Sequence, residues 1–222
     1  MSGPGTGVVT RRRYGMATTV MDGLVEAPAL AGELLIDFLY LDLETCTRCR
    51  GTDVNLEAAL AEVGRILDAA GMGVSVRKTL VDSAEQARTL GFVSSPTIRV
   101  NGNDIALELR ESNCGDCGEV CACDGAVDCR VWVWQGQEYT EAPPAMIVDA
   151  ILREVYSGAE RAVATGSVAA VPENLTRFFA GKARLVAEDT SCCPPAEQAA
   201  CCEPSQKASC CGDGVSESCG CQ

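Results

Sequence analysis

The sequence contains no histidine, and this absence removes several kinds of chemistry at once. Without an imidazole, the chain cannot use a Cys-His pair, a Ser-His-Asp triad or a zinc site with histidine ligands. Basic residues are also few, because 18 Lys and Arg stand against 31 Asp and Glu and leave a net charge of -13. A chain this acidic has no electrostatic attraction for nucleic acid. The reactive groups that remain are thiols and carboxylates.

Long apolar runs are missing as well. The basic stretch Arg11 to Arg13 is followed by residues that Asp22 and Glu26 interrupt, so the continuous apolar region of a secretory signal is absent. The longest apolar run is much shorter than a helix that crosses a bilayer. We therefore expect a cytoplasmic protein with no membrane partner, whose thiols are mostly reduced or bound to metal.

Cysteine is what the chain has in abundance, with 15 residues in 222. They fall into three groups: the pair Cys46 and Cys49; the five residues Cys114, Cys117, Cys121, Cys123 and Cys129; and the eight residues Cys192, Cys193, Cys201, Cys202, Cys210, Cys211, Cys219 and Cys221. Each group predicts a different use of sulfur.

The hydrophobic pattern predicts one packed α/β domain over residues 33–157, a usual size for a single domain. A dense apolar run over 33–43 is typical of a buried strand, and apolar residues at helical spacing follow it over 56–70. Further on, a cysteine-rich and glycine-rich insertion over 111–129 has no apolar period and is expected to be a loop. The remaining segments are expected to be a flexible leader, a linker with one short amphipathic helix, and a disordered tail: residues 1–32, 158–190 and 191–222.

The linker helix is expected over residues 172–180, where Leu175, Phe178 and Phe179 lie on one face. This face could dock on the domain, or it could bind a groove of a partner protein, because both uses show the same spacing. Simple packing on the domain is the favoured interpretation.

The CxxC motif of Cys46 and Cys49 lies where a strand passes into a helix. The helix N-terminus favours the thiolate form, as do Arg48 and Arg50, although nearby acidic residues oppose them. Cys46 would attack a disulfide or a soft ion and Cys49 would resolve the product. The alternative is a pair of packed thiols. Gly51, directly after the pair, leaves open that the motif precedes the helix and that Thr52 or Asp53 is the cap.

The order strand, CxxC, helix, strand, helix, Ser-Pro-Thr strand, strand, helix resembles the thioredoxin-like fold, a mixed sheet flanked by helices. More closely, YLDLETCTRCRGT, SSPTIRVNG, NCGDCGEVC and VDCRVW resemble an uncharacterised prokaryotic family of thioredoxin-like proteins, known as a domain of unknown function. The resemblance implies that Ser95 and Pro96 form the cis-proline pair that lies against the CxxC, so both are carried over as site residues. It implies a fold and no settled activity.

The insertion has the cysteine spacing of a metal-binding knuckle at Cys114 and Cys117. Two of the three remaining cysteines, Cys121, Cys123 and Cys129, could complete a zinc or iron-sulfur site and leave one thiol spare. The alternative is a loop held by disulfides or carrying free thiols.

The tail repeats cysteine pairs every nine residues, and its composition cannot build a core. Adjacent cysteines can present two soft ligands to one ion, and trivalent arsenic, mercury, cuprous copper and zinc suit such ligands. The pairs resemble the tails of arsenite methyltransferases and arsenite chaperones. The alternative is unspecific scavenging, as in metallothionein.

Together these features predict a protein of metal or metalloid handling, of the arsenite or mercury type. In it the CxxC performs thiol exchange or ion transfer, and the tail captures soft ions. A thiol redox partner protein is expected for the exchange reaction, and no cofactor is required. One alternative is a metallochaperone or metal sink without catalysis. A lower alternative is cleavage of a carbon-metal bond, in which Asp42 or Glu44 would supply the proton.

Overall fold

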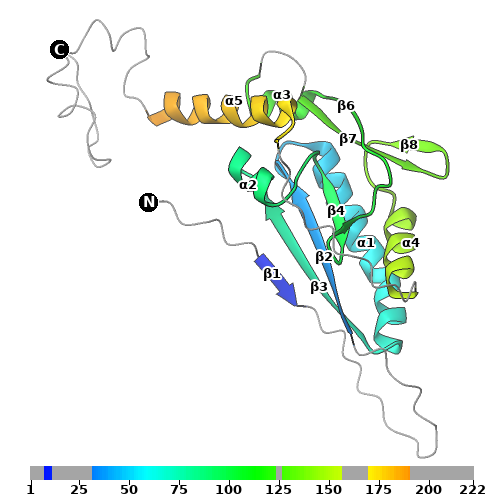
Figure 1. Cartoon of the computed structure of the whole chain (residues 1–222). Coiled ribbons are helices and arrows are strands. Elements are labelled where there is room, and N and C mark those ends of the chain that lie inside the picture. Colours follow the sequence, from blue (N-terminus) through cyan, green and yellow to red (C-terminus); the bar gives the residue numbers. More distant parts are fainter. Residues whose placement is uncertain (1–7, 12–31, 124–126, 157–169, 191–222) are drawn as a thin grey trace, which may run out of the picture.

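The computed structural model of the chain describes residues 8–11, 32–123, 127–156 and 170–190 (Figure 1). A five-stranded mixed sheet has the order β1-β3-β2-β4-β5. Its central strand β2 is parallel to β3 and antiparallel to β4, whereas β1 is antiparallel to β3 and β5 to β4. The strands are β1 (Val8–Arg11), β2 (Gly32–Tyr40), β3 (Met72–Leu80), β4 (Thr97–Val100) and β5 (Asn103–Asp104).

Two helices cover one face of this sheet, α1 (Thr47–Ala69) and α4 (Pro144–Tyr156), and they lie side by side (Figure 1). Every second residue of β2, namely Leu34, Ile36 and Phe38, is buried against them. This alternation follows from the period of two along a strand. Gly71 follows the end of α1 with a φ of 72°, a conformation that a residue with a side chain rarely adopts.

Two tight turns, each ending in glycine, join neighbouring antiparallel strands. Asn101 and Gly102 have φ values of 50° and 83° between β4 and β5. Gln135 and Gly136 have values of 51° and 77° between β7 (Val127–Trp134) and β8 (Gln137–Tyr139). Two consecutive positive φ values are typical of the tight turns that match the twist of antiparallel strands.

The insertion is more ordered than the sequence indicates. Instead of a loop over residues 111–129, it contains a strand and a short helix and belongs to a second sheet of order β6-β7-β8. The strand β6 shows no apolar period because four of its five residues are exposed and its pairing with β7 is made by the backbone. The elements are β6 (Arg110–Cys114), α3 (Gly115–Val120), β7 (Val127–Trp134) and β8 (Gln137–Tyr139).

The segment expected to be a linker ends in a helix of 18 residues, α5 (Glu173–Thr190), longer than the short helix predicted. Its apolar face docks on the domain, where Leu175 and Phe178 are fully buried and Phe179 is nearly so. Together with α2 (Ala84–Thr89) and six cysteines, α5 forms a second core at the end of the sheet where α1 begins (Figure 1).

The leader also contains structure, because Val8–Arg11 pair with β3 as an edge strand. The rest of the leader and the whole tail, with the cysteines from Cys192 to Cys221, lie outside the described residues. Within the described ranges, no helix has the length and apolar character needed to cross a membrane.

Candidate metal centre

The CxxC motif lies at the very start of α1. Cys46 is the N-cap of the helix, and Cys49 lies in its first turn. The carboxylate of Asp42 accepts hydrogen bonds from the backbone N–H groups of Thr45 and Cys46 and fixes the chain as it enters the helix. The cap is therefore neither Thr52 nor Asp53. Gly51 is inside the helix, and the space beside its Cα holds the carboxylate of Glu141.

Four cysteine sulfurs come together at this helix start, from Cys46, Cys114, Cys117 and Cys129, which we call the cysteine quartet. Their Sγ atoms all lie within 4.8 Å of one another. Cys46 and Cys114 are 4.0 Å apart, and Cys129 and Cys117 are 3.3 Å apart. All four side chains are buried. Among the described residues, no second group of this kind could hold a metal ion.

The distances fit a tetrahedral ion. Metal–sulfur bonds of about 2.3 Å require sulfur–sulfur separations of about 3.8 Å, and the two measured distances lie on either side of that value. Four donors and no carboxylate or water-facing position make this a closed site, which is typical of structural metal sites. The quartet therefore could hold a metal ion.

Two contacts between elements bring the ligands together. Cys46 caps α1, Cys114 caps α3, Cys117 lies within α3 and Cys129 lies on β7. The guanidinium of Arg48 donates to the carbonyl oxygens of Ser112, Asn113 and Cys129, which joins α1 to the β6–β7 pair.

The second contact joins the two helix starts directly. The carboxylate of Asp116, in the first turn of α3, accepts hydrogen bonds from the backbone N–H and the hydroxyl of Thr47. These bonds, the hydroxyl one foremost, hold the pKa of Asp116 below its ordinary value.

The buried thiols share their protons unequally. Hydrogen bonds from Cys114, Cys117 and Cys129 lower the pKa of Cys46 far below its ordinary value. Bonds from Cys117 and Cys129 also lower the pKa of Cys114, to about 7. The bond to Cys114 raises the pKa of Cys117 and Cys129, which act as the donors. In the metal-free centre, these hydrogen bonds therefore favour the thiolate form at Cys46 and Cys114 over Cys117 and Cys129.

Cys49 contacts this group without belonging to it. Its backbone N–H donates to the Cys46 sulfur at 3.4 Å, and its own sulfur lies 3.3 Å from the hydroxyl oxygen of Ser95. The hydrogen bond to Cys46, followed by burial, raises the pKa of Cys49. The peptide bond between Ser95 and Pro96 is cis, and the Ser95 side chain faces the CxxC, which matches the placement that the family resemblance implied for this pair.

The quartet differs from the metal site expected within the insertion. Cys121 and Cys123 form a disulfide with each other and supply no ligand, and the fourth ligand is Cys46 of the CxxC. Spacing alone could not reveal this, because Cys46 and Cys114 are 68 residues apart. The tertiary contact that brings the insertion to the CxxC lies on β7, where the Arg130 N–H donates to the carbonyl of Ser95.

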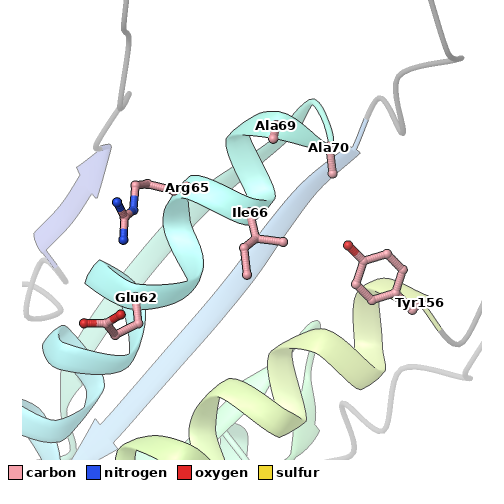
Figure 2. Close-up of a pocket in the computed structure, with 6 residues that line it drawn as sticks. All are labelled: Glu62, Arg65, Ile66, Ala69, Ala70 and Tyr156. Carbon is pink, nitrogen blue, oxygen red and sulfur yellow. The ribbon is translucent and has the colours of Figure 1, made fainter.

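A shallow groove elsewhere on the surface offers no comparable chemistry. It lies between the ends of α1 and α4 and is lined by Glu62, Arg65, Ile66, Ala69, Ala70 and Tyr156 (Figure 2). Arg65 and Glu62 point to one side of α1, while the ring of Tyr156 faces Ile66 and Ala70 from α4. The groove contains no thiol, so the sulfur chemistry of the described residues is concentrated at the other end of α1.

A family model described as a domain of unknown function (DUF2703) matches residues 34–151, more than half of the chain. No curated protein and no solved structure matches the chain. The matched residues include the CxxC, the Ser95–Pro96 pair and the whole quartet.

Proposed function

Because the chain belongs to the family described as a domain of unknown function (DUF2703), its activity has to be inferred from its own residues, and we propose that it binds a thiophilic metal ion through the quartet. The observation that carries this proposal is the meeting of four buried sulfurs from three separate segments within 4.8 Å. Burying four sulfurs together without a shared partner gives no advantage over aliphatic side chains, whereas four thiolates bind an ion strongly.

The donor set indicates the class of ion. Sulfur ligands select zinc, cuprous copper and other soft ions over magnesium or calcium. An iron-sulfur cluster spreads its cysteine ligands over more than one iron, so its sulfurs lie farther apart than those of the quartet. A single tetrahedral ion of the zinc type is the best match. When bound, such an ion would join α1, α3 and β7 and neutralise part of the thiolate charge.

The scaffold is proposed to be thioredoxin-like. The support is a CxxC at a helix start beside a mixed sheet, with a cis Ser95–Pro96 bond next to Cys49. Thiol–disulfide exchange is therefore the second candidate function. Against it stands the burial of Cys46, whose exposed fraction is 0%. A sulfur without exposed surface cannot meet the disulfide of another protein unless the centre opens.

The tail is proposed to collect soft ions of the arsenite or mercury type for the domain. Its eight cysteines lie directly after α5, whose other end is docked beside the quartet. A tethered ligand string raises the local concentration of ions near the domain. The first proposed function is therefore that of a metallochaperone or metal sink. Catalysis belongs only to the second candidate function, thiol–disulfide exchange.

The test uses the full-length chain with the eight tail cysteines replaced by serine, so that the domain is measured with the chain length unchanged. We load this parent protein anaerobically with zinc, remove free zinc, and determine the bound ion by elemental analysis. We expect one ion for each chain. Replacing Cys46, Cys114, Cys117 or Cys129 by serine should weaken binding at least about tenfold, about 1.4 kcal/mol.

Two control variants sharpen the result. Cys49→Ser and the double variant Cys121→Ser/Cys123→Ser should bind zinc as the parent protein does, because neither changes a quartet sulfur. If the parent protein binds no zinc, or if Cys49→Ser loses as much affinity as Cys46→Ser, the quartet is not the site. If the parent protein binds no zinc but reduces a small disulfide, and Cys46→Ser abolishes this reduction, thiol–disulfide exchange is supported in place of metal binding.

A further inference from the structure

The centre contains one thiol more than an ion of this kind needs. Four sulfurs complete a tetrahedral site, yet Cys49 lies against the Cys46 sulfur with its own side chain 0% exposed. Its nearest polar contact outside the sulfurs is the Ser95 hydroxyl. Aliphatic side chains such as Leu39 and Leu41 are buried in the same core. The use of a thiol at this position therefore has to be explained by its chemistry.

Cys49 is placed to act as a covalent partner for Cys46. The two residues are three positions apart at the start of a helix, with the N–H of one on the sulfur of the other. Residues three apart on a helix place their Cβ atoms about 5–6 Å apart, and this spacing closes to a disulfide with small backbone changes. The other cysteines that contact Cys46 approach from α3 and β7, where each is also a ligand.

We propose that Cys46 and Cys49 form a peroxide-reactive pair whose oxidation withdraws Cys46 from the quartet and releases the bound ion. The proposal rests on the metal-binding function proposed above. The Cys46 thiolate attacks one oxygen of hydrogen peroxide, the O–O bond breaks, hydroxide leaves and Cys46 becomes a sulfenic acid. The Cys49 thiol then attacks this sulfur, the S–O bond breaks and water leaves. The two sulfurs together lose two electrons and the peroxide gains two.

The positions of the two residues suit these roles. Cys46 caps α1, and its sulfur accepts the backbone N–H of Cys49 at 3.4 Å, so the resolving residue lies beside the sulfur that the peroxide oxidises. Thiolates are the nucleophiles of thiol chemistry, and a neighbouring thiol resolves the sulfenic acid. The oxidant must be small, because none of the Cys46 surface is exposed to a protein disulfide.

The consequence for metal binding follows from the ligand count. A disulfide sulfur is a much poorer ligand than a thiolate, so oxidation of Cys46 reduces four thiolate donors to three. Cys114, Cys117 and Cys129 take no part in this disulfide and remain thiolate donors. The centre thereby couples a two-electron oxidation to loss of its ion.

The experiment uses the zinc-loaded full-length chain with serine at the eight tail cysteines. Stoichiometric hydrogen peroxide is added, zinc release is followed with a colorimetric chelator, and disulfides are located by mass spectrometry of peptides. We expect one zinc ion to be released for each Cys46–Cys49 disulfide formed. In Cys49→Ser, which keeps all four ligands, release should be at least tenfold slower.

A second comparison separates the two disulfides of the domain. Cys121→Ser/Cys123→Ser should release zinc at the rate of the parent protein, because this pair contributes no ligand. Equal release from Cys49→Ser and the parent protein, or a disulfide joining Cys46 to Cys114, would overturn the proposal while zinc binding itself stands. Failure of Cys49→Ser to bind zinc at all would instead contradict the ligand set of the proposed function.

Discussion

Arg48, between the two cysteines of the CxxC motif, joins the segments that supply the quartet. Its guanidinium donates to the carbonyls of Ser112, Asn113 and Cys129 and to the Ser112 hydroxyl. Planar guanidinium groups can serve several acceptors at fixed angles, which a lysine ammonium cannot reproduce. An arginine at this position therefore orients Cys46 and Cys129 relative to each other.

We predict that Arg48→Ala destabilises the domain by about 1–3 kcal/mol, since hydrogen bonds to a charged group are lost. Arg48→Lys should recover only part of this loss. The free energy of unfolding in urea measures the loss of stability. Zinc affinity should be highest in the parent protein, lower in Arg48→Lys and lowest in Arg48→Ala. The matched control is Arg50→Ala, because Arg50 is exposed and donates to the Glu44 carbonyl in its own segment. Equal losses at positions 48 and 50 would contradict the role of Arg48.

Asp116 provides a second contact of this kind at the residue scale. Its carboxylate accepts from the Thr47 N–H and hydroxyl, so a side chain of α3 caps α1. We predict that Asp116→Asn costs about 0.5–2 kcal/mol of unfolding free energy, as the loss of a helix cap does. Glu119→Gln, which removes the same charge at an exposed position of α3, is the control. If Glu119→Gln lowers the unfolding free energy as much as Asp116→Asn does, the effect comes from the loss of charge and not from the lost cap.

At the scale of elements, α5 depends on one glycine for its close approach to the domain. A Cβ on Gly181 would lie 2.8 Å from the Cys123 sulfur and closer still to the carbonyl oxygen of Cys121. In an exposed helix, exchange of glycine for alanine gains about 1 kcal/mol. Here the added methyl group meets backbone, which cannot rotate away, so the sign of the effect is reversed.

We predict that Gly181→Ala weakens docking of α5 and costs about 1–3 kcal/mol, the usual cost of overpacking. Hydrogen exchange of the α5 amides should increase, because Phe178 and Leu175 lose their buried positions. Gly73→Ala adds the same group to β3, where nothing lies within 4 Å of the new atom. If both variants leave exchange in α5 unchanged, the close contact at Gly181 does not limit docking.

The elements differ in how far the sequence could predict them. The strand before the CxxC, the cap of α2 at Ser83 and the turn at Asn101 carry local signals, namely an apolar run, a capping residue and a turn pair, and the structure agrees with each. In contrast, β6 is exposed and polar, and it exists because β7 pairs with it. Pairing between backbones leaves no periodic trace in the side chains, so this strand could not be read from the sequence.

At the scale of the whole molecule, the candidate site could also be predicted only in part from the sequence. The sequence indicated that cysteines of the CxxC and of the insertion were functional, and it treated them as two sites. The structure makes one site of them by folding the insertion over the start of α1. Spacing rules detect ligands within a motif, whereas the fourth ligand here depends on tertiary packing of β7 beside the cis-proline loop.

This arrangement couples metal binding to the folding equilibrium of the whole domain. The ligands come from α1, α3 and β7, and the unfolded chain cannot bring these segments together. An ion that binds the folded form stabilises it by about 4 kcal/mol at a thousand times its dissociation constant. We therefore predict that zinc raises the urea midpoint of the full-length chain with serine at the tail cysteines, and that a chelator reverses the change.

The comparison of Cys46→Ser with Cys49→Ser decides whether this stabilisation arises at the quartet. Both variants remove one buried thiol from the same helical turn, so their costs in zinc-free protein should be similar. The increment due to zinc should disappear in Cys46→Ser and persist in Cys49→Ser, because only the former lacks a ligand. An equal increment in both would mean that zinc binds elsewhere on the folded chain and that the four sulfurs meet for packing alone.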